Sequence, residues 1–105
     1  MGTITKKIRT EVFEWNDEKA LRNIQVHHVS FEEAATVFSD TNALYAEDFD
    51  HSDVDEERFN IIGISEKLRL LIVCHCLRSN DVIRIISARK ATNEERGDYE
   101  QQLSG

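Results

Sequence analysis

The feature that most constrains the fold is a nearly continuous apolar run over residues 68–78. A run of this kind, bounded by turn residues, predicts a central β-strand that is covered on both faces. Ser79 and Asn80 follow as a tight-turn signal, and residues 82–88 form a second β-rich run, Val-Ile-Arg-Ile-Ile-Ser-Ala. The two runs predict a β-hairpin within a sheet.

A first strand and helix are expected ahead of this hairpin. Residues 11–15 resemble a short strand, and Asn16 is a typical N-cap residue for the helix that follows. The helix is expected to run to about His28. Its period places Leu21 and Ile24 on the buried face.

Two further helices begin with a capping-box pattern, in which a Ser or Thr and a Glu three residues later satisfy each other's free amides. The first begins at Ser30 and Glu33, and its apolar residues recur at helical spacing: Phe31, Ala34, Ala35 and Phe38. The second begins at Thr92 and Glu95 and is expected to end near Leu103.

These elements define a fold class. With further strands over residues 43–46 and 58–65, the predicted order is β-α-α-β-β-β-β-α. Sequential hairpins in the second half make this an α+β domain, with a mostly antiparallel sheet, two N-terminal helices and a C-terminal helix. Residues 11–105 are expected to form this one domain, and residues 1–10 a disordered tail.

The hairpin also predicts which side chains face each other. A two-residue loop at Ser79-Asn80 would place His75 opposite Arg84 and Arg69 opposite Lys90, all four on one face of the sheet. Such a cluster would be stable only with a phosphate or carboxylate between the cations. The alternative is that the last helix covers the cations and that Glu94 or Glu95 neutralises them.

Charge is divided along the chain, whose net charge is −7. Seven acidic residues fall within residues 47–57, and the rest of the chain holds 13 acidic side chains, 20 less these seven, against 13 basic ones. Residues 65–92 carry six basic residues and two acidic ones. We therefore expect an acidic loop and a basic C-terminal half. No apolar run reaches membrane-spanning length and no signal peptide is evident, so the cytoplasm is the expected compartment.

The sequence predicts neither a metal nor a cofactor. Cys74 and Cys76 lie in the apolar run, where free cysteines pack as small buried side chains. A zinc pair is the alternative, but none of the histidines shows ligand spacing: His27, His28, His51 and His75. A metal cluster in the acidic loop would use His51, Asp53, Asp55 and Glu56, whose spacing fits no calcium loop.

An ordered set of short motifs resembles the BrnT toxin family. The N-terminal part comprises Trp15-Asn16-Asp17-Glu18-Lys19, Asn23, His28 and Val29-Ser30-Phe31-Glu32-Glu33-Ala34. The C-terminal part comprises Arg84-Ile85-Ile86-Ser87-Ala88-Arg89-Lys90-Ala91, Glu95-Arg96 and Tyr99. Between them stand His51, Glu57-Arg58-Phe59, Ile62-Gly63, Ser65 and Arg69. The resemblance covers residues 12–99.

The resemblance implies a RelE-like ribonuclease that inhibits translation by cleaving RNA. It also implies a type II toxin–antitoxin operon with a BrnA-like ribbon-helix-helix antitoxin, through which alone the complex contacts DNA. Three positions depart from the family pattern: His27-His28-Val29 for Lys-His-Gly, Asp40-Thr41 for Asp-Pro, and Cys76-Leu77-Arg78 for Thr-Glu-Arg. The alternative is a weak or inactive member that serves as an antitoxin-binding, co-repressor module.

Catalytic candidates follow from the chemistry of metal-independent RNA cleavage, in which a 2′-OH attacks the neighbouring phosphate. Arg84 and Arg89 are the first candidates to stabilise the phosphorane, because guanidinium binds two phosphate oxygens at once. On an ideal strand these two residues point to opposite faces, so a shared site requires an irregular strand. His75 and Glu95 are the candidate acid and base, and their alternatives are a satisfied sheet histidine and a capping residue.

Further candidates would bind RNA or the antitoxin. Supporting RNA contacts are predicted for Arg69, Arg78, Lys90, Trp15 and Tyr99, although Trp15 and Tyr99 also suit the core. The acidic loop suits an antitoxin with a basic surface, through Asp48, Asp50, Asp53 and Asp55. A solvated loop without a partner is the alternative.

Overall fold

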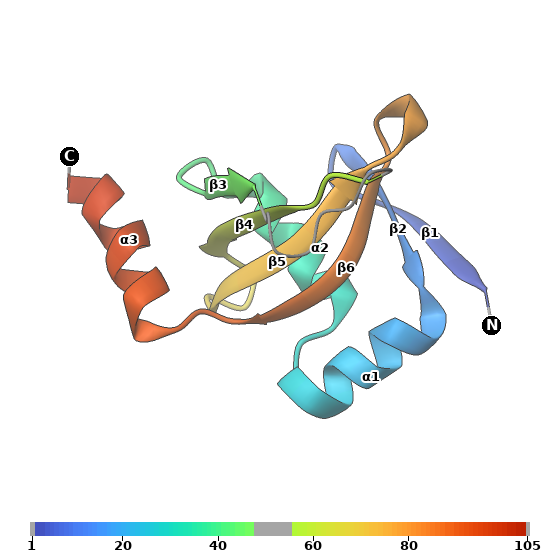
Figure 1. Ribbon diagram of the computed structural model, residues 1–105, viewed down its shortest axis with the longest axis horizontal. Helices are drawn as coiled ribbons and strands as arrows, with labels where there is room; N and C mark the ends of the chain where they lie inside the picture. The colour runs from blue at the N-terminus through green and yellow to red at the C-terminus, as the bar shows by residue number, and fades with distance from the viewer. Residues whose placement is uncertain (1, 48–55, 105) are drawn as a thin grey trace.

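A six-stranded sheet dominates the computed structural model, which describes residues 2–47 and 56–104 (Figure 1). The strand order is β1-β2-β6-β5-β4-β3, in which only β2 and β6 run parallel. The strands are β1 Thr3–Ile8, β2 Glu11–Asn16, β3 Leu44–Glu47, β4 Phe59–Ile64, β5 Leu70–Leu77 and β6 Ile83–Lys90. The helices are α1 Asp17–His27, α2 Phe31–Thr36, a 3₁₀ turn η1 Val37–Ser39, a second turn η2 Ser79–Asp81, and α3 Asn93–Ser104.

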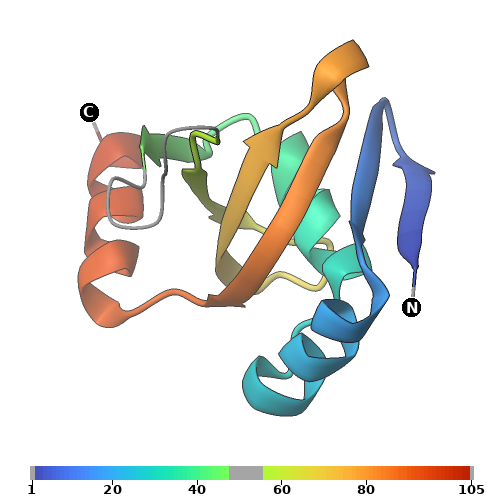
Figure 2. The ribbon, with the colours of Figure 1, turned by 45° about the vertical axis from the view of Figure 1, so that its right-hand side comes forward.

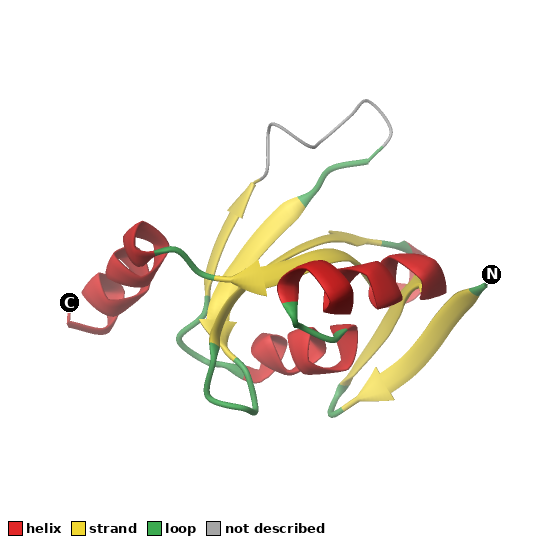
Figure 3. Cartoon of the chain, turned by 90° about the horizontal axis from the view of Figure 1, so that it is seen from below, coloured by secondary structure: helices red, strands yellow, loops and turns green. Residues whose placement is uncertain are grey.

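The core lies on one face of the sheet, where α2 and η1 pack; we call this the helix face. Its largest members are Trp15 and Phe13 of β2, Phe31 of α2 and Ile85 of β6, none more than 2% exposed. Figure 3 shows α1 and α2 toward the side of the molecule that carries the N-terminus, and α3 on the opposite side. The opposite side of β5 and β6 is the outer face, which combines apolar side chains of β5 with polar side chains of β6. The α+β class is confirmed.

The predicted disorder of residues 1–10 is wrong, because Thr3–Ile8 forms the edge strand β1. It pairs with β2 in an antiparallel hairpin through a turn at Arg9, whose φ is 58°. Ile4 and Ile8 pack against the core, and Lys6 lies over the Trp15 ring at 6.0 Å. Ile4 and Ile8 lie an even number of positions apart, which places both on one face of a strand, and this spacing was the sequence signal for β1.

The orientation predicted for α1 is also wrong. Asn16 caps the helix as expected and accepts a hydrogen bond from the Lys19 amide at 2.9 Å. Leu21 and Ile24, however, are 58% and 44% exposed, and the buried residues of α1 are Ala20 and Asn23. Ala20 and the polar Asn23 thus face the sheet, in place of the apolar pair.

The end of α1 explains how the chain manages without the family's glycine. His28 adopts the left-handed conformation at φ 59° and donates its amide to the Ile24 carbonyl. Val29, which stands where the family pattern has Gly, is fully buried in the core.

The hairpin of β5 and β6 forms as predicted, but its register differs by one residue. Leu77 pairs with Ile83, because η2 makes a longer loop in which Asn80 and Asp81 both have positive φ. Asn and Asp tolerate this conformation better than other non-glycine residues. His75 consequently lies opposite Ile85 and not Arg84.

A β-bulge then shifts the register again. Cys74 pairs with Ser87 while His75 pairs with Ile85, so Ile86 is an extra residue in β6. The adjacent apolar residues Ile85 and Ile86 break the period of two, and this break was the visible sequence signal. The bulge determines which side chains of β6 share a face.

Within the described residues, no helix is long and apolar enough to cross a membrane.

Candidate functional site

The bulge brings the two principal candidate arginines to the same face of the sheet. Arg84 lies opposite Cys76, and Arg89 lies opposite Ile72. Because Cys76 and Ile72 are four residues apart on β5, their side chains project to the outer face together. The irregular strand that a shared site requires is therefore present.

At the hairpin end of the outer face, arginines and carboxylates alternate. Arg84 Nη1 donates to Glu14 Oε2 at 2.7 Å, and Arg78 Nε lies 3.7 Å from the same oxygen. Arg78 Nη1 also lies 3.5 Å from Glu56 Oε2. The other carboxylate oxygen of Glu56 pairs with Arg58 Nε at 3.2 Å. The Arg84 and Glu14 side chains are 21% and 22% exposed, so solvent reaches both. We call these five residues the arginine–glutamate network.

Glu14 was missed by the sequence reasoning. It sits between Phe13 and Trp15, whose side chains enter the core, so alternation places the carboxylate on the outer face. That much could have been predicted from the sequence. Its position beside Arg84 depends on the parallel pairing of β2 with β6, which no local pattern indicates.

Arg89 and Glu95 form a second cluster, at the other end of the outer face. Two parallel hydrogen bonds of 2.8 and 3.0 Å join the guanidinium to the carboxylate. Glu95 also completes the predicted capping box, accepting from the Thr92 amide while Thr92 Oγ1 accepts from the Glu95 amide. The hydrogen bonds from Arg89 lower the pKa of Glu95, against the effect of burial. A carboxylate held ionised in this way is a poor proton donor at neutral pH.

His75 lies on the helix face, away from Arg84. It is 3% exposed, and its ring packs edge-on against Phe38 with centroids 4.8 Å apart. The rings of Tyr45 and Phe59 lie 6.3 and 6.1 Å away. Burial lowers the pKa of His75, so the ring is neutral at physiological pH. The predicted partnership of His75 with Arg84 is wrong, and the alternative of a satisfied sheet histidine describes its environment.

Arg69 also lies apart from the network. Its guanidinium binds the Glu33 carboxylate, with Nε 2.9 Å from Oε2, and also donates to the His28 carbonyl at 3.0 Å. Glu33 is 2% exposed and accepts a third hydrogen bond from Ser65 Oγ at 2.7 Å. Burial alone would raise the pKa of Glu33, but the hydrogen bonds from Arg69 and Ser65 outweigh it and lower the pKa. The contacts of Arg69 join α2 to the β4–β5 turn.

The predicted aromatic RNA contacts are buried. Trp15 is 2% exposed and packs edge-on against Phe31, so a base cannot stack on it. Tyr99 is 5% exposed and donates to Asp40 Oδ2 at 2.6 Å, which anchors α3. Burial and this hydrogen bond raise the pKa of Tyr99 to about 12. Lys90 is exposed, and it pairs with the core residue Leu71, on the helix-face side of β6.

Four proposed antitoxin contacts lie outside the described residues: Asp48, Asp50, Asp53 and Asp55. The same holds for most of the alternative metal cluster. Across residues 2–47 and 56–104, no three His, Cys, Asp or Glu side chains come together as metal ligands would. Cys74 and Cys76 are not joined in a disulfide. Burial and the nearby Glu56 raise the pKa of Cys76, which is 1% exposed.

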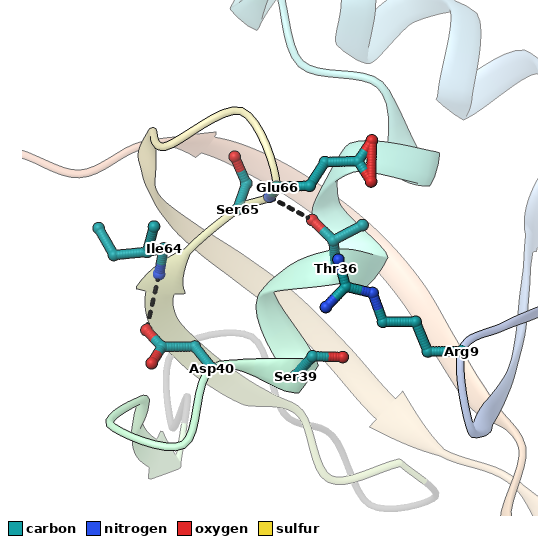
Figure 4. Close-up of a pocket in the computed structure, with 7 residues that line it drawn as sticks. All are labelled: Arg9, Thr36, Ser39, Asp40, Ile64, Ser65 and Glu66. Atoms are coloured by element: carbon teal, nitrogen blue, oxygen red, sulfur yellow. Dashed lines mark hydrogen bonds between the residues drawn. The ribbon is translucent and has the colours of Figure 1, made fainter.

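Cavities beside the sheet include two that are lined by described residues. The first, of about 220 Å³, lies where η1 meets the end of β4 (Figure 4). Asp40 accepts the Ile64 amide at 2.8 Å and Thr36 accepts the Glu66 amide at 2.9 Å, so these groups stabilise the junction itself. The second, of about 330 Å³, lies between α1 and β6 next to the outer face.

Comparisons with known proteins agree with this architecture. Residues 15–95 match the family model described as the ribonuclease toxin, BrnT, of a type II toxin-antitoxin system. A crystal structure of the Brucella abortus ribonuclease toxin BrnT superposes with a TM-score of 0.57 at 21% identity, covering 75% of this chain and 94% of that one. No curated protein sequence matches. The fold and the family model together define a toxin of the ribonuclease class, and the chain belongs to the BrnT family.

Proposed function

We propose that this chain cleaves RNA without a metal ion, at the arginine–glutamate network of the outer face. The observation that carries the proposal is the carboxylate of Glu14, hydrogen-bonded to Arg84 and close to Arg78 on a solvent-accessible surface. A base beside two cations is what the reaction requires, since a proton must leave the 2′-OH while charge builds on the phosphate.

In the proposed reaction, Glu14 accepts the proton of the 2′-OH as that oxygen attacks the adjacent phosphorus. Arg84 and Arg78 stabilise the dianionic phosphorane, and the bond to the 5′ oxygen then breaks. The products are a 2′,3′-cyclic phosphate and a 5′-hydroxyl, whose proton comes from water or from the protonated Glu14. Arg89 lies five residues along β6, roughly 15 Å from Arg84, and would contact a neighbouring phosphate.

The physiological role extends the same proposal. Cleavage of messenger RNA would inhibit translation in the cytoplasm, and a BrnA-like ribbon-helix-helix antitoxin would neutralise the toxin and connect it to operator DNA. The acidic residues between β3 and β4 are suited to a basic antitoxin surface through charge complementarity. A relationship to the RelE fold remains a prediction from the family resemblance.

A second candidate function rests on the ion pairs of the same arginines. Arg84, Arg78 and Arg89 each already bind a carboxylate, and RNA must compete with these carboxylates for the guanidinium groups. A member whose arginines stay neutralised would bind the antitoxin and contribute to repression without cleaving RNA.

The deciding experiment is cleavage of labelled RNA by the purified full chain in the presence of EDTA. We expect cleavage with cyclic-phosphate ends, reduced about 10²- to 10⁴-fold in Glu14→Gln, the range typical of a lost general base. Glu32→Gln is the matched control, because Glu32 is an exposed carboxylate on α2 that pairs with Lys6. Equal rates in both variants would exclude Glu14 as the base, and intact RNA with the folded wild type would favour the second candidate function.

A further inference from the structure

The cavity between α1 and β6 lies where β6 is no longer paired with β2, although β5 still pairs with its other edge. The parallel pairing of β2 with β6 covers only Ile83 and Arg84. Further along β6, the side chain of Asn23 in α1 makes the backbone hydrogen bonds that a strand would make. Its Nδ2 donates to the Ala88 carbonyl at 2.8 Å, and its Oδ1 accepts from the Ala88 amide at 3.1 Å. Figure 2 shows α1 beside this end of β6. The bulge at Ile86 lies between the two attachments, and the cavity opens there.

Cations line the helical side of this groove. Lys19, Arg22, Asn23 and Val26 have the spacing of one helix face, and His27 adjoins them. Within residues 2–47 and 56–104, neither Lys19 nor Arg22 forms an ion pair, whereas Arg84, Arg78 and Arg89 all do. No acidic residue lines the groove, although acidic residues outnumber basic ones in the chain.

The larger apolar side chains of α1 do not face the sheet. A helix on the surface of a sheet ordinarily turns its apolar stripe inward. In α1, Leu21 and Ile24 are exposed and Ala20 and Asn23 are buried toward the sheet, while Lys19 and Arg22 lie on the flank that lines the groove. Burial of an apolar stripe therefore does not account for the orientation of α1, which leaves Lys19 and Arg22 beside the strand.

The groove is continuous with the candidate cleavage face. Ser87 lines it, is exposed, and lies on β6 between Arg84 and Arg89. Its pairing with Cys74 places its side chain on the outer face. A strand of nucleic acid that crosses the arginine–glutamate network can thus pass Ser87 and reach Lys19 and Arg22.

We propose that this groove binds the phosphate backbone of single-stranded RNA on one side of the cleavage site. The inference rests on the proposed function, since it extends the same substrate along the surface. Unpaired cations and a hydroxyl group suit phosphates, and phosphate contacts determine affinity and register irrespective of base sequence.

The test is binding of a short fluorescein-labelled RNA, 2′-O-methylated at every ribose so that it cannot be cleaved, across a series of salt concentrations. For Lys19→Ala/Arg22→Ala we expect weaker binding at low salt and a salt slope smaller by about 1.4, about 0.7 for each lost phosphate contact. Lys7→Ala/Arg96→Ala removes equal charge from exposed positions on β1 and α3, and is expected to keep the wild-type slope.

A gain-of-function variant avoids dependence on the folding of the double variant. Val26 is 60% exposed on the groove side of α1, so Val26→Arg adds a cation and is expected to raise the slope by about 0.7. Unchanged slopes in both groove variants would overturn the inference, as would an equal loss in the Lys7/Arg96 control. Cleavage of unmethylated RNA by the wild type tests the proposed function separately, since it does not depend on these binding slopes.

Discussion

Glu33 binds an arginine on the helix face of the sheet, and Glu14 binds one on the outer face. The two carboxylates differ in their exposure to solvent. The Glu33 side chain is 1% exposed and binds Arg69 and Ser65, which leaves it no access to a substrate. The Glu14 side chain is 22% exposed, and its partners Arg84 and Arg78 are reached by solvent. The same pair of residue types therefore stabilises the fold in one place and is available for chemistry in the other.

The largest effect on stability is expected from Arg69→Ala. Removing this arginine leaves the Glu33 carboxylate buried without its cation, which costs about 3 kcal/mol. For a domain of this size that corresponds to a fall in Tm of about 15 °C. Urea and thermal unfolding measure it, with Lys6→Ala as the control, because Lys6 and Glu32 are 48% and 50% exposed. Equal losses of unfolding free energy in both variants would mean that the buried Glu33 pair stabilises the fold no more than the exposed Glu32 pair.

The dependence of stability on acid pH should also distinguish the buried carboxylate of Glu33. The pKa of Glu33 is lowered from its ordinary value of 4.5 in the folded protein: burial raises it, and the hydrogen bonds from Arg69 and Ser65 more than offset this. A lowered pKa means that the pair stabilises the fold above about pH 4.5 and that this contribution is lost as the pH falls toward the folded value. Below pH 4.5, unfolding free energies should therefore decline more steeply for the wild type than for Glu33→Gln. Parallel declines would contradict the assignment.

The sequence predicted the elements of the fold better than it predicted their faces. Alternation and capping patterns identified β2, β4, β5, β6 and the three α-helices because those signals are local. The face on which Arg89 lies depends on one extra residue, Ile86, and a bulge reverses every later side chain in the strand. The loop at Asn80 and Asp81 likewise moved His75 away from Arg84.

The candidate site was predictable only in part. Arg84 and Arg78 were identified from residue type and from the family motif, and both reach the network. Glu14 could not be assigned because a parallel neighbour in the sheet leaves no pattern in the sequence. The buried side of α1 was mispredicted for a related reason: helical period predicts that an apolar stripe faces the sheet, but Asn23 faces it by hydrogen-bonding to Ala88.

The smallest expected effect concerns the stability of the network itself. Arg84 and Glu14 are a partly exposed pair that solvent reaches, so Coulomb attraction is screened and Arg84→Met should cost about 1 kcal/mol in unfolding free energy. Methionine keeps much of the apolar stem that covers the outer face, which separates loss of charge from loss of packing. Urea denaturation beside Arg69→Met makes the contrast direct. A cost near 3 kcal/mol for Arg84→Met would mean that the network stabilises the fold as the Glu33 pair does. In that case a loss of cleavage in network variants would no longer indicate chemistry at the outer face.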